Sequence, residues 1–156
     1  MAKDQLVKTF EEVFSFLSDE FEFKTIKSNS EDWGYCFTAV NNTTGVEIIY
    51  EIGDAYVNII LYKLVNGEIV DNTYKAIRNN EQINGFNLDL VVRNKNPNDL
   101  IRPAYEYGKD SEFYKPGVGL KNYITVFADN LRKYGSEVLK GDFTVFNKLD
   151  KILKEK

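Results

Sequence analysis

Carboxylate side chains are the groups in this 156-residue chain that could carry out chemistry, and their spacing limits what they could do. Glu47 and Glu51 share one face of a predicted strand, and four residues along a strand separate them by about 13 Å. Glycosidase carboxylate pairs lie roughly 5–9.5 Å apart, so this pair does not fit that chemistry. Glu22-Phe23-Lys24 is an acid-x-Lys triplet like those of some nucleases, but no acidic residue precedes it in an obvious partner strand. We therefore predict no catalytic residue.

The sequence contains no histidine and a single cysteine, Cys36. Without imidazole there is no Ser-His-Asp triad, no Cys-His pair and no histidine-ligated zinc. Cys36 stands between Tyr35 and Phe37, so we expect it to be a small buried apolar residue. We accordingly expect no metal site and no cofactor.

Two features that could bind phosphate have simpler explanations. Gly117-Val118-Gly119 precedes a predicted helix, but no Walker lysine follows at the required spacing, and the glycines suit a flexible helix entry after Pro116. The lysines near the C-terminus form the only basic cluster, and a helix dipole favours cations at that end. No aromatic groove accompanies them, so we expect no nucleic-acid partner.

Length and composition indicate one domain over residues 1–156, with a core large enough to fold without disulfides. The first residues lack the apolar run of a signal peptide, and nowhere do about eighteen apolar residues follow one another. We therefore expect a cytoplasmic protein without membrane association. Abundant Asn, Lys, Ile and Tyr with little Arg indicates an AT-rich coding sequence, and so a bacterial or phage origin.

Charge is distributed unevenly along the chain. Residues 1–60 carry four lysines against eleven acidic residues, a balance of −7, whereas residues 61–156 carry sixteen basic against thirteen acidic residues, a balance of +3. An acidic half disfavours phosphate backbones and steers basic molecules toward itself. If a protein partner exists, we expect it to be basic.

Hydrophobic periodicity predicts an α+β fold: an N-terminal helix, an antiparallel meander of four to five strands, and two C-terminal helices packed on the sheet. Apolar residues at three- and four-residue spacing indicate helices over residues 4–18, with Asp4 as N-cap, over 120–134, ending at Gly135, and after Asp142. Alternation indicates strands over 33–39, 46–52, 55–65, 68–74 and 86–92, and a short strand or helix exit at 21–23.

Two turn signals set the register of the strands. Asn66-Gly67 and Gly53-Asp54 both suit two-residue hairpin loops. With Gly53-Asp54 as the loop, the core face pairs Ile52 with Ala55, Tyr50 with Val57, Ile48 with Ile59 and Val46 with Leu61. The opposite face pairs Glu51 with Tyr56, Ile49 with Asn58 and Glu47 with Ile60. A slip of one residue would exchange the two faces, so this pairing is well specified.

The outward face of this hairpin is the predicted partner-binding surface. It mixes carboxylates with aromatic and aliphatic groups: Glu47, Ile49, Glu51, Tyr56, Asn58, Ile60 and Tyr62. Exposed aromatic residues give large contact area at low entropic cost, which suits a protein interface. The alternative is that a second helix layer covers this face. The interface interpretation predicts a non-catalytic binding module, such as an immunity or inhibitor protein or an accessory factor, that occludes a basic partner.

Two other functions stay open. A small-ligand-binding or enzymatic domain would place its pocket under the irregular segment 93–117, lined by Arg102, Tyr105, Tyr107 and Tyr114. A loop of that length is usually functional or mobile, or contains a short helix. A homo-oligomeric structural protein would instead bury the tyrosine and isoleucine patch against its own copy.

The C-terminal segment, from Leu131 through Val138-Leu139-Lys140-Gly141-Asp142 to Ile152, resembles the tail of small uncharacterised bacterial proteins. The opening helix with Phe14-Ser15-Phe16-Leu17 is similar in style to theirs. Some of those proteins are encoded beside toxins and are taken to be immunity proteins. The resemblance covers about a quarter of the chain; it implies a functional class and assigns no site residue.

Overall fold

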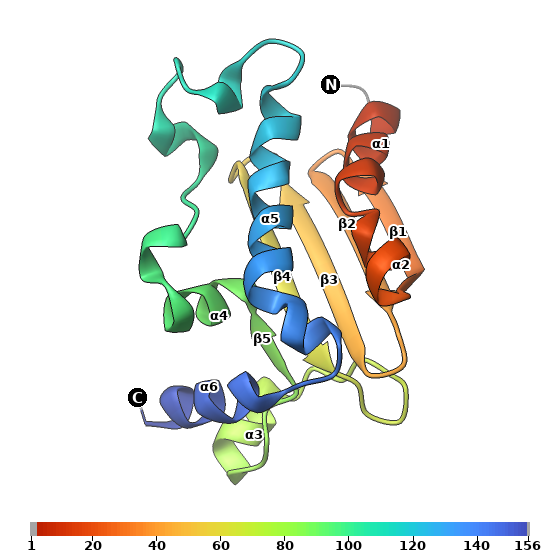
Figure 1. The fold of residues 1–156 in the computed structure, drawn as a ribbon, viewed down its shortest axis with the longest axis vertical. Helices are drawn as coiled ribbons and strands as arrows, with labels where there is room; N and C mark the ends of the chain where they lie inside the picture. The colour runs from red at the N-terminus through yellow and green to blue at the C-terminus, as the bar shows by residue number, and fades with distance from the viewer. Residues whose placement is uncertain (1–2, 156) are drawn as a thin grey trace.

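The computed structural model describes residues 3–155, so residues 1, 2 and 156 of the predicted domain lie outside the described part. The fold is α+β, as the sequence predicts (Figure 1). In chain order the elements are α1 (Lys3–Val13), α2 (Phe16–Phe21), β1 (Lys24–Glu31), β2 (Gly34–Val40), β3 (Thr44–Glu51), β4 (Tyr56–Lys63), α3 (Thr73–Asn79), β5 (Gly85–Asn87), α4 (Leu88–Lys95), the 3-10 helices η1 (Pro97–Asp99), η2 (Ala104–Tyr107) and η3 (Glu112–Tyr114), α5 (Gly119–Leu139) and α6 (Thr144–Lys154).

Five strands form one antiparallel meander in the order β1-β2-β3-β4-β5. The register of β3 against β4 is the predicted one, with Ile48 opposite Ile59 and Glu47 opposite Ile60. Because side chains alternate along a strand, the register decides which residues enter the core. The core side of this hairpin is fully or almost fully buried at Val46, Ile48, Val57, Ile59 and Leu61.

Helices cover one face of the sheet. In Figure 1, α1 and α5 run in front of the strands. The ring of Phe10 in α1 packs on Tyr35 and Tyr50, with centroid distances of 5.2 and 5.8 Å. On α5, Leu131 is fully buried, and a Cβ added at the neighbouring Gly135 would come within 3.7 Å of Leu61. The opposite face of the sheet stays partly exposed at its centre.

The predicted helix over 4–18 is broken in two, which corrects the sequence interpretation. Phe14, Phe16 and Leu17 are all buried. Residues two apart point about 200° apart on a helix, so Phe14 and Phe16 cannot share one buried face of a continuous helix. The chain therefore kinks after Val13, where the Ser15 hydroxyl donates to the Glu12 carbonyl at 2.9 Å. Residues 21–23 are the end of α2 and the exit to β1, and do not form a strand.

Both predicted turns form, but each differs from the sequence interpretation. Asn66 and Gly67 have positive φ angles of 53° and 80°, as a type I′ turn requires. The returning strand over 68–74 does not form beyond a single bridge between Val65 and Glu68. Its place beside β4 is taken by β5, where Phe86 pairs with Leu61. A long-range pairing has thus replaced a local one.

The hairpin between β3 and β4 has a four-residue loop, because Glu51 and Tyr56 are the last paired residues. The predicted pair Ile52 and Ala55 is therefore wrong: Ile52 is 52% exposed, and the Ala55 amide donates to the Glu51 carbonyl at 3.0 Å. Trp33, predicted to share a face with Tyr35, lies in the neighbouring β1–β2 turn and is 46% exposed. Alternation holds inside the strands and fails where the chain turns.

The predicted strand over 86–92 is a strand only to Asn87, after which the chain becomes α4. The Asn87 side chain accepts a hydrogen bond from the Asp89 amide at 2.9 Å, which caps the helix. Leu88, Val91 and Val92 are buried, and their spacing is helical. The stretch contains both an alternating set of apolar residues, at 86, 88, 90 and 92, and a helical set, at 88, 91 and 92, so alternation alone misassigned it.

α5 runs past Gly135 to Leu139, which corrects the predicted helix end. The true stop is Gly141, with φ of 94°, whose amide donates to the Val138 carbonyl at 2.9 Å. The Asp142 amide donates to the Glu137 carbonyl at 2.9 Å, which completes a Schellman motif. The Asp142 carboxylate then accepts from the Thr144 amide at the start of α6, as the predicted cap. Helix capping therefore explains Leu139-Lys140-Gly141-Asp142, the Leu-x-Gly-Asp run within the C-terminal segment.

Segment 93–117 contains the end of α4 and three short 3-10 helices, so the alternative that it hides helical structure is confirmed. Ile101 and Ala104 are buried and fasten the segment to the core. The Ala104 amide also donates to the Ala55 carbonyl at 3.1 Å, which joins η2 to the β3–β4 loop.

Asn41, in the β2–β3 turn, joins three parts of the fold. Its amide nitrogen donates to the Phe21 and Leu139 carbonyls, both at 3.0 Å, and so binds the C-terminal ends of α2 and α5. Its side-chain oxygen accepts from the Thr44 amide at 2.8 Å. Helix ends leave carbonyls without intrahelical partners, and this one side chain satisfies two of them.

We expect Asn41→Ala to lower the free energy of unfolding by about 2–3 kcal/mol, because several hydrogen bonds worth about 1 kcal/mol each are lost. Urea unfolding followed by circular dichroism measures this. The matched control is Asn42→Ala at the exposed neighbouring position, which should change stability by less than about 0.5 kcal/mol. Equal effects of the two variants would contradict the role given to Asn41.

Candidate functional site

The face of the sheet away from the helices holds five of the predicted partner-binding residues. Glu47, Ile49, Asn58 and Ile60 are each intermediate in exposure, and Glu51 is exposed. The pairing places them in rows across the sheet, with Glu47 beside Ile60 and Ile49 beside Asn58. We call these five residues, together with Cys36 and Lys27, the open sheet face.

β1 and β2 extend this surface beyond the hairpin. Cys36 pairs with Ile49 on one side and with Asn29 on the other, and Thr38 lies between Lys27 and Glu47. Cys36 is partly exposed, which corrects its expected burial in the core. The same alternation that buries Tyr35 and Phe37 could have indicated this, because it sends the residue between them to the opposite face.

Glu47 lies at the centre of the open sheet face. Partial burial raises the pKa of its carboxyl, Lys27 opposes that rise, and Asp71 adds to it. Burial also raises the pKa of the Cys36 thiol, and the Glu47 charge raises it further. A carboxylate set among apolar neighbours favours a cationic group that approaches it, because less water screens the attraction.

Tyr56 does not belong to the open sheet face, although the sequence places it there. Its ring packs edge-on against Phe127 of α5 with a centroid distance of 5.2 Å, and its hydroxyl donates to the Asp89 carboxylate of α4. Burial and this hydrogen bond raise the pKa of Tyr56. β5 pairs with β4 only from Ile60 to Tyr62, so within residues 3–155 no strand lies beside Tyr56 at the start of β4. The Tyr56 ring passes over this open edge of the sheet and packs on the helices.

Tyr62 is only 5% exposed, which corrects its predicted role in partner contact. A Cβ added at Gly85 would lie 2.5 Å from its ring, so the ring covers that glycine. Burial, with the charges of Glu47 and Asp71, raises the pKa of Tyr62 to about 12. The chain after β4 also closes over this end of the sheet, since a Cβ at Gly45 would meet Ile69 at 2.6 Å.

Glu47 and Glu51 lie at different places on the hairpin, Glu47 opposite Ile60 and Glu51 opposite Tyr56. Glu51 meets Asp54 at the exposed hairpin tip, where a hydrogen bond that protonated Glu51 donates to the Asp54 carboxylate, together with the like charge of Asp54, raises the pKa of Glu51. Within residues 3–155, no three His, Cys, Asp or Glu side chains gather closely enough to hold a metal ion.

The four residues predicted to line a pocket under segment 93–117 are not brought together. Arg102 stacks its guanidinium on the Tyr107 ring at 4.6 Å, and the Tyr107 hydroxyl accepts from the Arg102 amide at 3.0 Å. Tyr105 is 61% exposed, and Tyr114 is 42% exposed beside a separate hollow near the start of α5. Both contacts between Arg102 and Tyr107 lie within segment 93–117 and stabilise its conformation.

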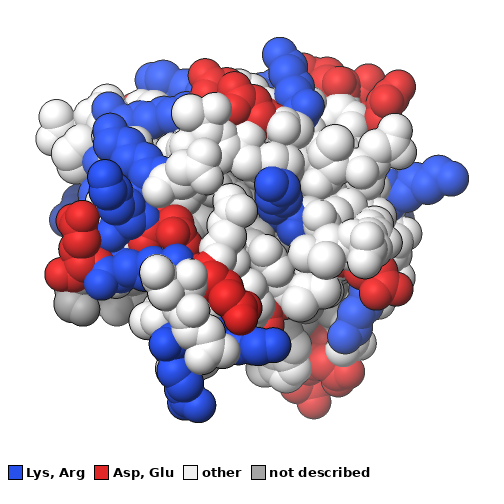
Figure 2. All heavy atoms as spheres, turned by 90° about the horizontal axis from the view of Figure 1, so that it is seen from below, with Lys and Arg blue, Asp and Glu red and all other residues white. Residues whose placement is uncertain are grey.

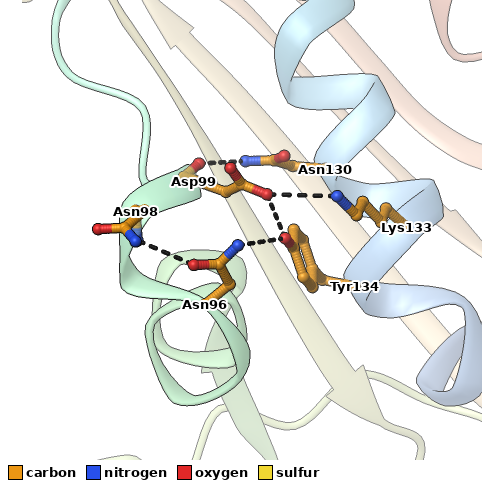
Figure 3. A network of polar contacts seen from close by, with 6 residues as sticks. All are labelled: Asn96, Asn98, Asp99, Asn130, Lys133 and Tyr134. Carbon is orange, nitrogen blue, oxygen red and sulfur yellow. Dashed lines mark hydrogen bonds and ion pairs between the residues drawn. The ribbon is translucent and has the colours of Figure 1, made fainter.

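A polar network holds the start of this segment on α5 (Figure 3). The Asp99 carboxylate accepts from the Tyr134 hydroxyl and, at 3.4 Å, from the Lys133 ammonium. The Asn130 side chain donates to the Asp99 carbonyl at 2.9 Å, and Asn96 reaches the Tyr134 hydroxyl. The bond from Tyr134 and the Lys133 charge hold the pKa of Asp99 below its usual value. We call this network the Asp99 latch, because it holds η1 against α5.

The lysines of α6 do not form a continuous basic surface. Figure 2 views the end of the molecule where α3 and α6 lie, and basic and acidic groups are interspersed there among uncharged residues. Lys154, for example, pairs with Asp150 at 3.0 Å.

Comparison with protein-family models, with curated proteins and with solved structures gave no match for this chain. Within the described residues, no helix has the length and apolar character that crossing a membrane requires.

We expect Tyr62→Ala to lower the free energy of unfolding by about 3 kcal/mol, because a large buried ring is removed. Glu51→Lys, at an exposed position of the same hairpin, should change it by less than about 0.5 kcal/mol. Thermal and urea unfolding of the two variants measure the difference. A Tyr62→Ala variant as stable as the wild type would show that the ring is not part of the core.

The Asp99 latch should make stability depend on pH. A lowered pKa means that the folded state favours the ionised carboxylate, so the stabilisation is complete above the ordinary Asp value of about 3.9 and is lost as pH falls through the folded value. We expect the difference in unfolding free energy between the wild type and Asp99→Asn to be constant near neutral pH and to shrink below about pH 4. Urea unfolding over a pH series measures it, with Asp110→Asn in the exposed loop as control. A difference that grows on acidification would contradict the latch.

Proposed function

We propose that this protein is a non-catalytic protein-binding module that covers a basic, partly apolar surface of a partner with its open sheet face. The observation that supports this most directly is the one-sided packing of the sheet. Helices bury one face, whereas Ile49, Ile60 and Glu47 lie half-exposed at the centre of the other. Apolar groups mixed with charged groups on a partly exposed surface are typical of interfaces that form between separately folded proteins.

Charge supports a basic partner. The partly buried Glu47 and the exposed Glu51 give this face carboxylates, and residues 1–60 carry a net charge of −7. Complementary charge speeds encounter and selects the partner, while apolar contacts such as those of Ile49 and Ile60 supply affinity. An immunity or inhibitor protein that occludes its target fits this description. The Leu-x-Gly-Asp run adds no support, since helix capping accounts for it.

The test is site-specific photo-crosslinking in the cells from which the gene comes. The photo-reactive residue p-benzoylphenylalanine replaces Asn58 on the open sheet face, and a matched variant carries it at Tyr74, which is 89% exposed on α3. We expect one discrete protein adduct from position 58 and little from position 74. Adding Glu51→Lys should reduce that adduct at least about tenfold, because a charge at an interface is reversed.

Three results would contradict the proposal. Equal labelling from positions 58 and 74 would show that the open sheet face has no preference for a partner. If Glu51→Lys leaves the yield of the adduct unchanged, the carboxylates of the open sheet face do not recognise the partner. An adduct with a second copy of the chain would favour the homo-oligomeric alternative.

A further inference from the structure

A second surface lies on the helix side of the sheet, between β1 and the two N-terminal helices. A cavity of about 410 Å³ opens there, within the range of roughly 300–1,000 Å³ that is usual for ligand pockets. Phe14 and Phe23 form part of its apolar lining, and Phe37 of β2 lies beneath. We call it the β1 groove.

The β1 groove exists because β1 has no large apolar side chain on its inner face. The pairing puts Thr25 opposite Ala39, Ser28 opposite Phe37 and Ser30 opposite Tyr35. Small polar residues give the helices nothing to pack on, so β1 is exposed at every position except Ser30, which is intermediate. The strand therefore leaves a hollow between itself and the two N-terminal helices, with Tyr35 and Phe37 of β2 buried at its base.

The outer edge of β1 is open to another strand. β1 is the first strand of the sheet and, among the described residues 3–155, pairs only with β2, so no strand of this part of the chain pairs with the outer side of β1. A bulge at Ile26, between Thr25 and Lys27, makes the first half of this edge irregular. The half from Ser28 to Glu31 is regular, and an extended chain could pair with it.

The charge of the β1 groove indicates what would bind there. Glu11 and Asp19 line it, and none of its lining residues is a lysine or arginine. Their neighbours Glu12 and Glu20 pair with Lys121 and Arg132, whereas neither Glu11 nor Asp19 is in an ion pair within residues 3–155. A cationic side chain would meet two unneutralised carboxylates beside an aromatic surface, a combination that favours Lys or Arg.

We propose that the β1 groove binds an extended, basic segment of a partner protein, which adds a strand to β1 and inserts an apolar side chain over Phe14 and Phe37. Main-chain hydrogen bonds to a sheet edge supply affinity, and pockets for alternate side chains supply specificity. The occupant has an aromatic or aliphatic residue for the cavity and a Lys or Arg near it for Glu11 or Asp19. This site is separate from the open sheet face and does not depend on the function proposed for it.

The experiment begins with a random dodecapeptide phage library selected on the immobilised full chain. We expect enriched peptides to share an aromatic or aliphatic residue close to Lys or Arg. A synthetic peptide of the consensus is then measured by fluorescence anisotropy. The same peptide with alternate amides N-methylated should bind at least tenfold more weakly, because N-methylation blocks strand pairing without changing the side chains.

Matched variants locate the binding. Ser28→Phe fills the groove from β1 and should weaken binding at least tenfold, whereas Ser28→Ala removes only the hydrogen bond between Ser28 and Tyr35 and should leave it within twofold. Glu11→Lys should weaken binding most at low salt, because attraction between charges is screened by ions. Glu51→Lys on the open sheet face should have no effect, which separates this site from the proposed function.

Several outcomes would overturn the proposal. One is a phage selection whose enriched peptides share no consensus sequence. Another is a consensus peptide that binds the Ser28→Phe and Glu11→Lys variants as tightly as it binds the wild type. Undiminished binding of the N-methylated peptide would exclude strand addition. A dimer in sedimentation equilibrium that Ser28→Phe dissociates would show that a second copy occupies the groove, and binding of free arginine amide as tight as that of the peptide would indicate a small-molecule site.

Discussion

The structure depends on burying one face of a five-stranded sheet under a single layer of helices. Phe10 on α1 packs on Tyr35 and Tyr50 of the sheet. Phe10, Leu131 on α5, and Ile48 and Leu61 at the centre of the sheet are all fully buried. Each large apolar side chain removed from water contributes about 1.5–3 kcal/mol, so this layer is the main source of stability. Within residues 3–155 the centre of the other face has no such layer and stays half-exposed, at Glu47, Ile49 and Ile60.

Polar contacts at the ends of the elements complete this arrangement. Asn41 binds the ends of α2 and α5, Asp99 and Tyr134 hold η1 on α5, and Asp142 starts α6 where α5 stops. Each contact satisfies backbone or side-chain groups that packing alone would leave without partners. Apolar burial thus decides which elements meet, and these polar contacts decide where each element ends.

Both candidate surfaces follow from the same one-sided layering. The open sheet face exists because, within residues 3–155, no second layer covers the centre of the hairpin. The β1 groove exists because the inner face of β1 carries only small polar side chains beneath the N-terminal helices. The two differ in character: one is a broad face with Glu47 at its centre, and the other is an aromatic hollow beside a free strand edge.

The sequence by itself determined the fold class, the meander and the β3–β4 register, because alternation over eight residues and a short loop permit only one arrangement of faces. It also indicated Glu47, Ile49, Glu51, Asn58 and Ile60 as outward-facing residues. Only the tertiary structure decided that residues 88–95 are a helix, that 68–74 lose their place to β5, and that Tyr56 and Tyr62 are drawn away from the open sheet face. Those outcomes depend on which distant segment reaches an edge of β4, and contacts between segments far apart in the chain leave no periodic signal in the residues themselves.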